Sequence, residues 1–343
     1  MSAARRGAII GFGNAAEHGH LPGWLNHPDF EIVAVADARS ERRALAKTLL
    51  PEIGIYSTHE ELLASESLDF VDIASPPAFH RDAVLAAAAA GLHVLCEKPL
   101  VTTVEDYRPI RKAVDAAGVV LHAVHNWKFS EAFLCLEDII RSGRIGAIEH
   151  IVFEVERNGW SVSDDDWRIR KSIAGGGILV DHGWHNFYLI LSLAAQTPTS
   201  VHATLERRRY LDAEIEDTAA CEIAFPGLSA EVHLTWAAMR RRTRWLLHGS
   251  SGRVAIDDDV IEIDNGAGHR AHKLVAGLSA GSHHPDWFPG VLQSFRREIE
   301  EPEGRGRNRA EAEWCLVLLD RAYASAAQAG CALPLSAPAA LFV

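Results

Sequence analysis

A glycine-rich turn directly after a short apolar segment is the feature that most constrains this chain. Gly11-Phe12-Gly13-Asn14-Ala15-Ala16 follows Ala8-Ile9-Ile10, and the residues after the turn favour a helix. A strand, a tight glycine turn and a helix make the first half of a βαβ unit, in which backbone N–H groups at the helix N-terminus can meet a pyrophosphate. The chain is therefore predicted to begin with a parallel sheet.

Asp37 gives this turn a second, matching feature. It ends the second predicted strand, where an acidic side chain can accept hydrogen bonds from an adenosine ribose. A turn that uses glycine only for its geometry is the alternative, but it leaves Asp37 unexplained. The Asp37 carboxylate would repel a 2′-phosphate and favours NAD, whereas Arg39 could offset that charge and admit NADP. We expect a dinucleotide cofactor, NAD in preference to NADP.

Short β-branched segments alternate with helical segments through about residue 125, which is typical of a doubly wound parallel sheet. The strands predicted there are 7–10, 32–37, 70–74, 94–96 and 119–124, with helices from about His18, Ser40, Glu60 and Ala78.

Beyond residue 145 the pattern changes to strands joined by short turns such as Pro226-Gly227 and Asn265-Gly266, which indicates a largely antiparallel sheet. The predicted strands are 148–157, 201–209, 219–225, 230–236, 244–248 and 260–263, with helices at 178–193 and 310–329. Because 343 residues are too many for one ordinary core, we expect two domains, 1–125 and 126–343.

Composition narrows the function classes. Asp and Glu number 46 against 34 Lys and Arg, and a net charge of −12 opposes a bulk affinity for nucleic acid or anionic membrane. The longest apolar run, Ala83 to Ala90, is too short to span a bilayer. The cysteines are odd in number, scattered and without a Cys-x-x-Cys spacing, which predicts reduced thiols in a cytoplasmic protein. They are Cys96, Cys135, Cys221, Cys315 and Cys331.

Two segments follow predicted strands at the carboxyl edge of the first sheet, where ligands of such folds lie. Glu97-Lys98-Pro99 comes directly after an apolar strand, so a stiff proline turn would point the Lys98 ammonium into a crevice. Ser75-Pro76-Pro77 with His80 ends the preceding strand. Each segment alone is weak evidence for a site, because Glu-Lys-Pro is a common tripeptide and the proline segment could be only a stiffened loop. Their shared position at the sheet edge makes a functional role more plausible for both.

A third motif joins glycines to acid–base groups. Gly175-Gly176-Gly177 predicts a flexible loop before a helix in which Asp181 and His185 are four residues apart, a spacing that places both on one helical face. A carboxylate beside a histidine is an oriented acid–base unit that exchanges a proton near neutrality, although a purely structural pair has the same spacing. Asp181 and His182 lack a third ligand, so we expect no metal.

Taken together, these motifs resemble the Gfo/Idh/MocA family, the relatives of glucose-fructose oxidoreductase and inositol dehydrogenase. The resemblance covers essentially the whole chain. It implies a Rossmann domain followed by an open-faced, mainly antiparallel sheet domain flanked by helices. It also implies NAD(P)-dependent hydride transfer at a secondary alcohol of a sugar or cyclitol, and a homo-oligomer, dimer or tetramer, formed through the open sheet. The matching segments are Gly11 to Ala16, Asp37, Ser75 to His80, Glu97 to Pro99, Asn126 to Gly146 and Gly175 to His185.

The resemblance also implies roles for single residues. Lys98 would contact the reacting hydroxyl and the nicotinamide, His185 would donate or accept the proton, and Asp181 would bind substrate. Cofactor contacts are expected from Gly11, Phe12, Gly13, Asn14, Ala15, Asp37, Ala38, Arg39, Ser75, Pro76, His80, Glu97, Lys98 and Asn126. Substrate contacts are expected from Lys98, Lys128, Trp160, Trp167, Arg168, Asp181 and His185. The segment from Trp160 to Arg170 could cover the pocket, with indoles on a sugar face, or be a packed surface loop.

The chain departs from the family pattern at two places. Lys128 stands where many relatives have an arginine, and His185-Asn186-Phe187-Tyr188 stands where they have His-x-x-Asp. Substrate identity is therefore less transferable than the fold. Two other functions stay open: a tightly bound NAD used for non-redox glycoside cleavage or elimination, and a nucleotide-sensing regulator without turnover. We interpret Arg207 to Arg209 and Arg240 to Arg242 as solvated edges or interface charges, with an anionic substrate as the alternative.

Overall fold

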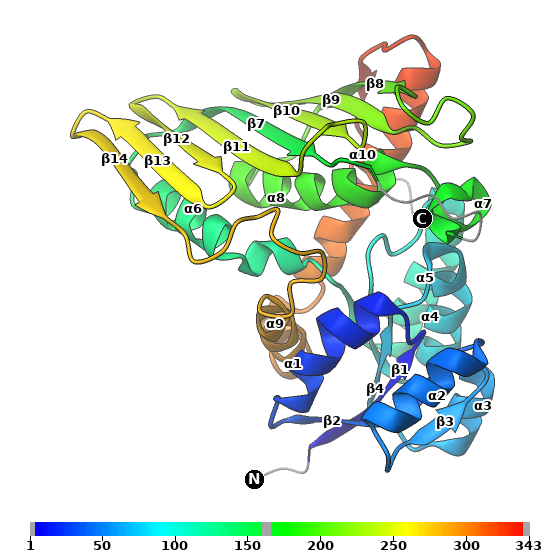
Figure 1. Ribbon diagram of the computed structural model, residues 1–343. Helices are drawn as coiled ribbons and strands as arrows, with labels where there is room; N and C mark the ends of the chain where they lie inside the picture. The colour runs from blue at the N-terminus through cyan, green and yellow to red at the C-terminus, as the bar shows by residue number, and fades with distance from the viewer. Residues whose placement is uncertain (1–3, 160–165, 339–343) are drawn as a thin grey trace. The chain divides into compact units, whose positions relative to one another are not determined.

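The computed structural model describes residues 4–159 and 166–338, which form two compact units (Figure 1). Among the described residues, the N-terminal unit joins residues 4–126 with His283–Ala312, and the C-terminal unit joins Trp127–Ser282 with residues 313–338. The segment His283–Ala312, however, lies in the N-terminal unit, whereas the sequence pattern places it in the second domain.

The N-terminal unit contains a six-stranded sheet in the order β3-β2-β1-β4-β5-β6, and every neighbouring pair is parallel. The strand order reverses between β1 and β4, which makes the carboxyl end of β1 the switch point where ligands of such sheets bind. Strand β3 escapes prediction because three residues carry no periodic pattern. The strands are β1 (Arg5–Ile10), β2 (Phe30–Ala36), β3 (Gly54–Tyr56), β4 (Phe70–Ile73), β5 (His93–Cys96) and β6 (Leu121–Ala123).

Helices of this unit begin and end at recognisable signals. Thr58 and Thr103 cap α3 and α5 through their side-chain oxygens, and Gly118 ends α5 with a φ of 65°. The helices are η1 (Ala15–His20), α1 (Leu21–Leu25), α2 (Ser40–Leu49), α3 (His59–Ser65), η2 (Pro77–Phe79), α4 (His80–Ala89), α5 (Val104–Ala117), α9 (Phe288–Glu300) and η6 (Pro302–Gly304). Here η1 is a π-helical segment, and η2 and η6 are short 3₁₀ turns.

Aromatic packing explains why α9 belongs to the N-terminal unit. The rings of Phe288 and Trp24 meet edge to face with centroids 5.8 Å apart, and Phe295 meets Phe70 at 6.0 Å. All four side chains are buried. Burying aromatic rings of this size stabilises a fold by several kcal/mol in total, at about 25 cal/mol per Å² of apolar surface. The contacts join positions more than 200 residues apart, which no local pattern reveals.

The C-terminal unit contains a nine-stranded sheet in the order β14-β13-β12-β11-β7-β10-β9-β8-β15. All its neighbouring pairs are antiparallel except β7 with β10. The strands are β7 (Ile148–Glu156), β8 (Ser200–Glu206), β9 (Thr218–Phe225), β10 (Leu228–Thr235), β11 (Arg242–Gly249), β12 (Gly252–Asp257), β13 (Val260–Asn265), β14 (Gly268–Lys273) and β15 (Leu333–Pro334). The predicted turns at Pro226-Gly227 and Asn265-Gly266 are confirmed, and the sheet is mainly antiparallel as expected.

The helices not yet named are η3 (Asn126–Phe129), α6 (Glu131–Arg141), η4 (Trp167–Ile169), α7 (Lys171–Ala174), η5 (Leu179–Gly183), α8 (Trp184–Ala194) and α10 (Arg307–Ala327). Some of these helices cover one face of the nine-stranded sheet. Figure 1 shows α6 and α8 along the same face of the sheet. On β7, buried Ile151, Phe153 and Val155 alternate with partly exposed Val152 and Glu154, the alternation of a sheet with one covered face.

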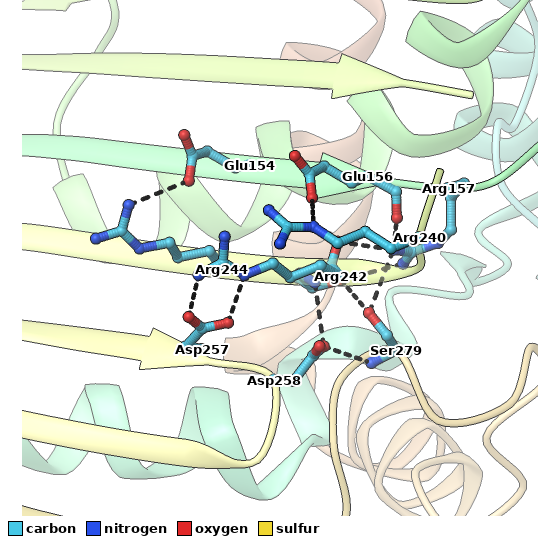
Figure 2. Close-up of polar contacts among 10 residues, drawn as sticks. Glu154, Glu156, Arg157, Arg240, Arg242, Arg244, Asp257, Asp258 and Ser279 are labelled. Carbon is cyan, nitrogen blue, oxygen red and sulfur yellow. Dashed lines mark hydrogen bonds and ion pairs between the residues drawn. The ribbon is translucent and has the colours of Figure 1, made fainter. Parts of the chain in front are cut away.

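Charged side chains on and next to the central strands pair across the opposite face, which we call the outer face (Figure 2). Arg240 donates to Glu156 at 2.6 Å, Arg242 forms a two-point pair with Asp257, and Arg244 lies 3.5 Å from Glu154. Arg240 and Arg242, which belong to one of the basic clusters of the sequence, therefore have carboxylate partners on the sheet itself. Within the described ranges, no helix is both long and apolar enough to cross a membrane.

Candidate active site

The candidate site residues form two groups, one in each unit, and the first lies at the glycine turn after β1. Gly11 has a φ of 88°, and a Cβ there would come within 2.6 Å of the backbone nitrogen of Ser75, so both the turn and the close approach require glycine. A Cβ at Gly13 would meet nothing nearer than Arg39 at 3.9 Å. The backbone at Gly13 is therefore open to a ligand, while that at Gly11 is packed on the neighbouring strand end.

Asp37 ties this turn to the end of β2. Its carboxylate accepts the backbone N–H of Phe12 at 2.7 Å and that of Arg39 at 2.9 Å, and the carboxylate is almost fully buried. Arg43 donates to the carbonyl oxygens of Asp37 and Ala38, both at 2.8 Å. A carboxylate has about four acceptor positions, so Asp37 keeps capacity for ribose hydroxyls after these contacts.

Two arginines border the same edge. The Arg39 guanidinium lies 3.3 Å from the Asp37 carboxylate and is about half exposed, at 53%. Arg42 donates to Glu17 at 2.9 Å and to the side-chain oxygen of Asn14. The Asn14 side chain is thus directed to Arg42, which leaves its backbone as the group available to a pyrophosphate.

Two orphaned atoms test whether a dinucleotide fits these residues. Ser75 Oγ and Asn126 Oδ1 are buried and have no hydrogen-bond partner among the described residues of the chain. Buried polar atoms are nearly always satisfied, so such atoms at the ligand edge of a parallel sheet indicate a group that supplies the partners. Together with the open backbone at Gly13 and the acceptor capacity of Asp37, they fit a nicotinamide dinucleotide.

The buried His80 side chain contacts the backbone of the two turns at the carboxyl edge of the parallel sheet. Its Nε2 lies 2.7 Å from the carbonyl oxygen of Ser75 and its Nδ1 lies 2.9 Å from that of Pro99. Burial lowers the pKa of His80 below its ordinary value, so the ring is neutral and one nitrogen donates at a time. His80 is fully buried and acts on the site through the backbone of two turns.

Glu97 is held by a buried network that the sequence motif does not show. His20 contacts Asp72 through Nδ1 at 3.0 Å and Glu97 through Nε2 at 2.9 Å. The indole of Trp24 donates to Asp72 at 2.7 Å, and Phe288 stacks on the His20 ring at 4.3 Å.

Charge fixes the protonation of this network. Burial alone would lower the pKa of His20, but the charges and hydrogen bonds of Asp72 and Glu97 outweigh it and raise the pKa to about 10. Burial likewise would raise the pKa of Glu97, and its bonds to His20 lower it below the usual range. At neutral pH, His20 is therefore an imidazolium between two carboxylates.

Lys98 follows at the carboxyl end of β5. Its backbone N–H donates to the Glu97 carboxylate at 2.9 Å, and its peptide bond to Pro99 is cis. The turn that carries the Lys98 side chain is thus attached to the His20–Asp72–Glu97 network and, through Pro99, to His80. These contacts hold the lysine backbone at the sheet edge.

The second group begins at Gly175-Gly176-Gly177, and a different structural constraint requires glycine at each of the three positions. Gly175 ends α7 with a φ of 85°, a Cβ at Gly176 would overlap the hydroxyl of Tyr323 at 1.9 Å, and one at Gly177 would overlap the carbonyl oxygen of Glu216 at 1.8 Å. The sequence suggests a flexible loop, but the structure packs this segment tightly.

Glu216 holds the start of the helix that follows. Its carboxylate accepts the backbone N–H groups of Gly177 at 3.0 Å and Leu179 at 3.1 Å, and the hydroxyl of Tyr323 at 2.8 Å. Burial raises the pKa of Glu216 above its ordinary value, although these three donors oppose the rise. The arrangement replaces the N-terminal side-chain cap that η5 lacks.

His185 and Asp181 lie beyond this anchored start. Asp181 is in η5, a π-helical turn, and His185 is in α8, so the simple α-helical i, i+4 relation of the prediction does not describe them. The Asp181 side chain is 41% exposed and His185 is 7% exposed. His185 Nδ1 lies 2.8 Å from the hydroxyl of Tyr188, and the indole of Trp127 stacks on the imidazole at 5.1 Å.

The remaining residues expected to contact substrate are Lys128, Trp160, Trp167 and Arg168. Lys128 lies on η3, directly after Trp127, and is partly buried. The Arg168 guanidinium lies over the ring of Trp167 at 4.7 Å and 3.4 Å from Asp166, so these side chains contact one another. Trp160 lies outside the described residues.

The sequence pattern gave no role to several residues that hold the two groups, namely His20, Asp72, Glu216 and Tyr188. One signal was present: Asp72 interrupts the apolar strand Phe70-Val71-Asp72-Ile73, and a charge in a strand buried on both faces requires a partner. Its partner is 52 residues away, so the sequence could not name it.

Comparison with known proteins decides the family. Residues 5–125 match the model of the oxidoreductase family with an NAD-binding Rossmann fold, and residues 133–255 match that of the GFO/IDH/MocA C-terminal domain. The chain belongs to the Gfo/Idh/MocA oxidoreductase family. Its fold, two-sheet organisation and NAD-binding domain are those that the sequence motifs predict.

Three relatives illustrate this family. The chain is 30% identical over 231 residues to a 1,5-anhydro-D-fructose reductase of Ensifer adhaerens, which covers 65% of this chain and 67% of that protein. It is 32% identical over 189 residues to a D-glucoside 3-dehydrogenase of Escherichia coli, covering 54% and 52%. The chain thus spans about half to two thirds of the length of these curated relatives. The structure of a levoglucosan dehydrogenase with NADH and L-sorbose superposes with a TM-score of 0.83 at 22% identity, over 98% of this chain and 100% of the other.

Proposed function

We propose that this family member is a nicotinamide-dependent dehydrogenase that transfers a hydride between NAD(P) and a secondary alcohol of a sugar or cyclitol. The observation that carries the proposal is His185. It is almost fully buried, its Nδ1 is held by Tyr188, and Trp127 stacks on its ring. A histidine fixed in this way is suited to exchange a proton at Nε2 with a bound substrate.

The residues would divide the chemistry as follows. NAD(P), when bound, supplies the hydride acceptor. In the oxidative direction His185 accepts the hydroxyl proton as hydride leaves the same carbon, and Lys98 stabilises the negative charge that develops on that oxygen. Asp181, with its half-exposed carboxylate, binds a neighbouring hydroxyl. The fixed backbone at Glu97 holds Lys98 in place without reorganisation during the reaction.

The cofactor preference follows from Asp37. Its buried carboxylate would repel a 2′-phosphate, and Arg39, already 3.3 Å from that carboxylate, is committed in part to neutralising it. We therefore propose NAD as the preferred cofactor. The curated relatives act on an anhydro sugar and a glucoside, which supports a carbohydrate substrate.

Assembly and location complete the proposal. We propose a homo-oligomer that forms through the outer face of the nine-stranded sheet, where the helices leave the strands uncovered on the side of Glu154 and Arg244. A cytoplasmic location is supported by the cysteines, all five of which are free thiols.

The test is NADH and NADPH formation with aldoses, inositols, glycosides, anhydro sugars, sugar acids and sugar phosphates. We expect turnover with NAD, and a loss of kcat of about 10²–10⁴-fold in Lys98→Ala and His185→Ala. Lys112→Ala and His233→Ala, which change exposed residues outside the candidate set, are the matched controls. Tight NAD binding without NADH release across the panel would overturn the proposal. Conversion of a glycoside in that case would favour non-redox chemistry, and full silence would favour a nucleotide-sensing regulator.

A further inference from the structure

Tyr188 lies one turn after His185 on α8, at the position where the family pattern has the aspartate of His-x-x-Asp. Its side chain is fully buried, and its hydroxyl oxygen lies 2.8 Å from Nδ1 of His185. The same oxygen accepts the backbone N–H of Trp127 at 3.1 Å. The Trp127 indole in turn stacks on the imidazole, with the planes 26° apart. Tyr188 and Trp127 therefore hold the ring at its edge and on its face.

We propose that Tyr188 is the positioning residue of His185. It engages Nδ1 whether or not that atom carries a proton, and so directs proton exchange with the substrate to Nε2. The inference rests on the proposed function, because it takes His185 as the acid–base group. It goes beyond that function by assigning to a phenol a role for which the family pattern offers a carboxylate.

A phenol differs from a carboxylate in two ways that change the chemistry of His185. It carries one proton and two acceptor positions, so beside the Trp127 N–H it can donate to a bare Nδ1 or accept from a protonated one. It is also neutral, and Tyr188 therefore gives the imidazolium no added charge stabilisation. A neutral imidazole is the form that accepts a proton from an alcohol, which suits the oxidative direction.

Other titratable groups lie on the elements packed around this ring. His182 on η5 has its ring centroid 6.4 Å from that of His185, and Asp181 is its neighbour on the same turn. Lys128 on η3 follows Trp127, and the Cys315 thiol on α10 lies 4.0 Å from the carbonyl oxygen of Trp184. All of these remain in the Tyr188 variants. Differences between the variants therefore report on Tyr188 itself.

The first experiment is ¹⁵N NMR of the histidine rings in the whole protein as pH is varied, with the His185 signals assigned by their loss in His185→Gln. In Tyr188→Asp we expect the pKa of His185 to rise by about one to three pH units, because a buried carboxylate beside Nδ1 stabilises the imidazolium. In Tyr188→Phe we expect the ¹⁵N chemical shift of His185 Nδ1 to move to the value of a nitrogen without a hydrogen bond. An unchanged titration in Tyr188→Asp, or an unchanged Nδ1 shift in Tyr188→Phe, would overturn the proposal without any substrate.

The second experiment is the pH profile of kcat with the best substrate of the panel. Tyr188→Phe should lower kcat about tenfold with little change in KM, because the variant loses one hydrogen bond to the acid–base group. Tyr188→Asp should move the acidic limb of the oxidative profile to higher pH, because a nearby carboxylate stabilises the imidazolium. Tyr107→Phe, which removes a buried phenol on α5, is the control for lost packing. If His185→Ala is inactive while Tyr188→Phe keeps the wild-type kcat and profile, the inference fails and the proposed function stands. If His185→Ala is fully active, the assigned role of His185 in the proposed function fails.

Discussion

At the scale of single residues, His20 shows how a buried charge supports a sequence motif. Replacing His20 by Ala leaves Asp72 and Glu97 buried without their shared cation, so we expect unfolding to become easier by about 3–5 kcal/mol at neutral pH. The wild-type pKa is raised from 6.5 to about 10, so the native state binds the extra proton. The stabilisation is complete below pH 6.5 and is lost as pH rises through about 10.

Urea unfolding at several pH values from neutral to about 10 measures this difference. The gap between wild type and His20→Ala should narrow steadily as pH rises. His18→Ala is the matched control, since that histidine lies on the same η1 segment and its side chain is 54% exposed. A gap that is constant with pH, or no larger than that of the control, would show that His20 is not the charged centre of the network.

The residue scale also marks the limit of sequence reasoning. The positions of Lys98, Asp37 and Gly11 at strand ends were predictable because each residue lies in a segment that directly follows an apolar strand, and that pattern is local in the sequence. Glu97 belongs to the same motif, but its partner His20 is 77 residues away. The pairing depends on the packing of η1 against β4 and β5, so no local pattern contains it.

At the scale of elements, the start of η5 shows that the triple glycine is packed. In Gly177→Ala the new Cβ would fall 1.8 Å from the carbonyl oxygen of Glu216, which is backbone and cannot move freely. We expect the helix start to shift, with a loss of about 1–3 kcal/mol in unfolding free energy. Because Asp181 and His185 follow this start, kcat should fall more than KM rises.

Thermal unfolding and steady-state kinetics of the same preparation test both parts. Gly266→Ala is the control, because that glycine lies in the β13–β14 turn and a Cβ there would meet no atom within 4 Å. If Gly177→Ala matched Gly266→Ala in stability and turnover, the anchoring of η5 by Glu216 would not matter for function.

Element prediction came close for several strands with alternating burial and failed for a strand that has no apolar pattern. Strands β7, β9 and β10 alternate buried and exposed residues and were predicted close to their bounds. Every residue of β14 is exposed, so its sequence carries no hydrophobic period. The helical pattern over 178–193 was predicted, but its first part is π-helical, since backbone geometry at a helix start depends on tertiary contacts such as those of Glu216.

At the scale of the whole molecule, the two-domain division followed from a change in strand pattern, whereas the return of His283–Ala312 to the N-terminal unit depends on aromatic contacts with Trp24 and Phe70. The change in pattern is visible locally. The docking of α9 is not visible locally, because an amphipathic pattern shows that the helix has an apolar face but not which core covers it. Family membership is therefore a sounder inference from the sequence than the exact course of the chain.

The outer face of the nine-stranded sheet carries the last prediction. A row across the central strands places Val152 of β7 beside Leu246 of β11 and Ala255 of β12, with Glu231 of β10 on its other side. Charge pairs such as Arg244 with Glu154 flank this apolar centre. A two-fold related copy could therefore cover the apolar row and match each charge with its opposite. We expect an oligomer by light scattering coupled to size exclusion.

Leu246→Arg should shift that oligomer to a smaller species, because the new guanidinium would be buried without a carboxylate opposite it. Glu105→Arg, a surface change on α5 of the other unit, should leave the mass unchanged. Since Leu246 is on the outer face, the folded protomer should persist, and NAD binding by the variant would confirm that. A wild-type chain that elutes as a monomer would show that there is no such interface. A Leu246→Arg variant that keeps the oligomer's mass would show that the interface lies elsewhere.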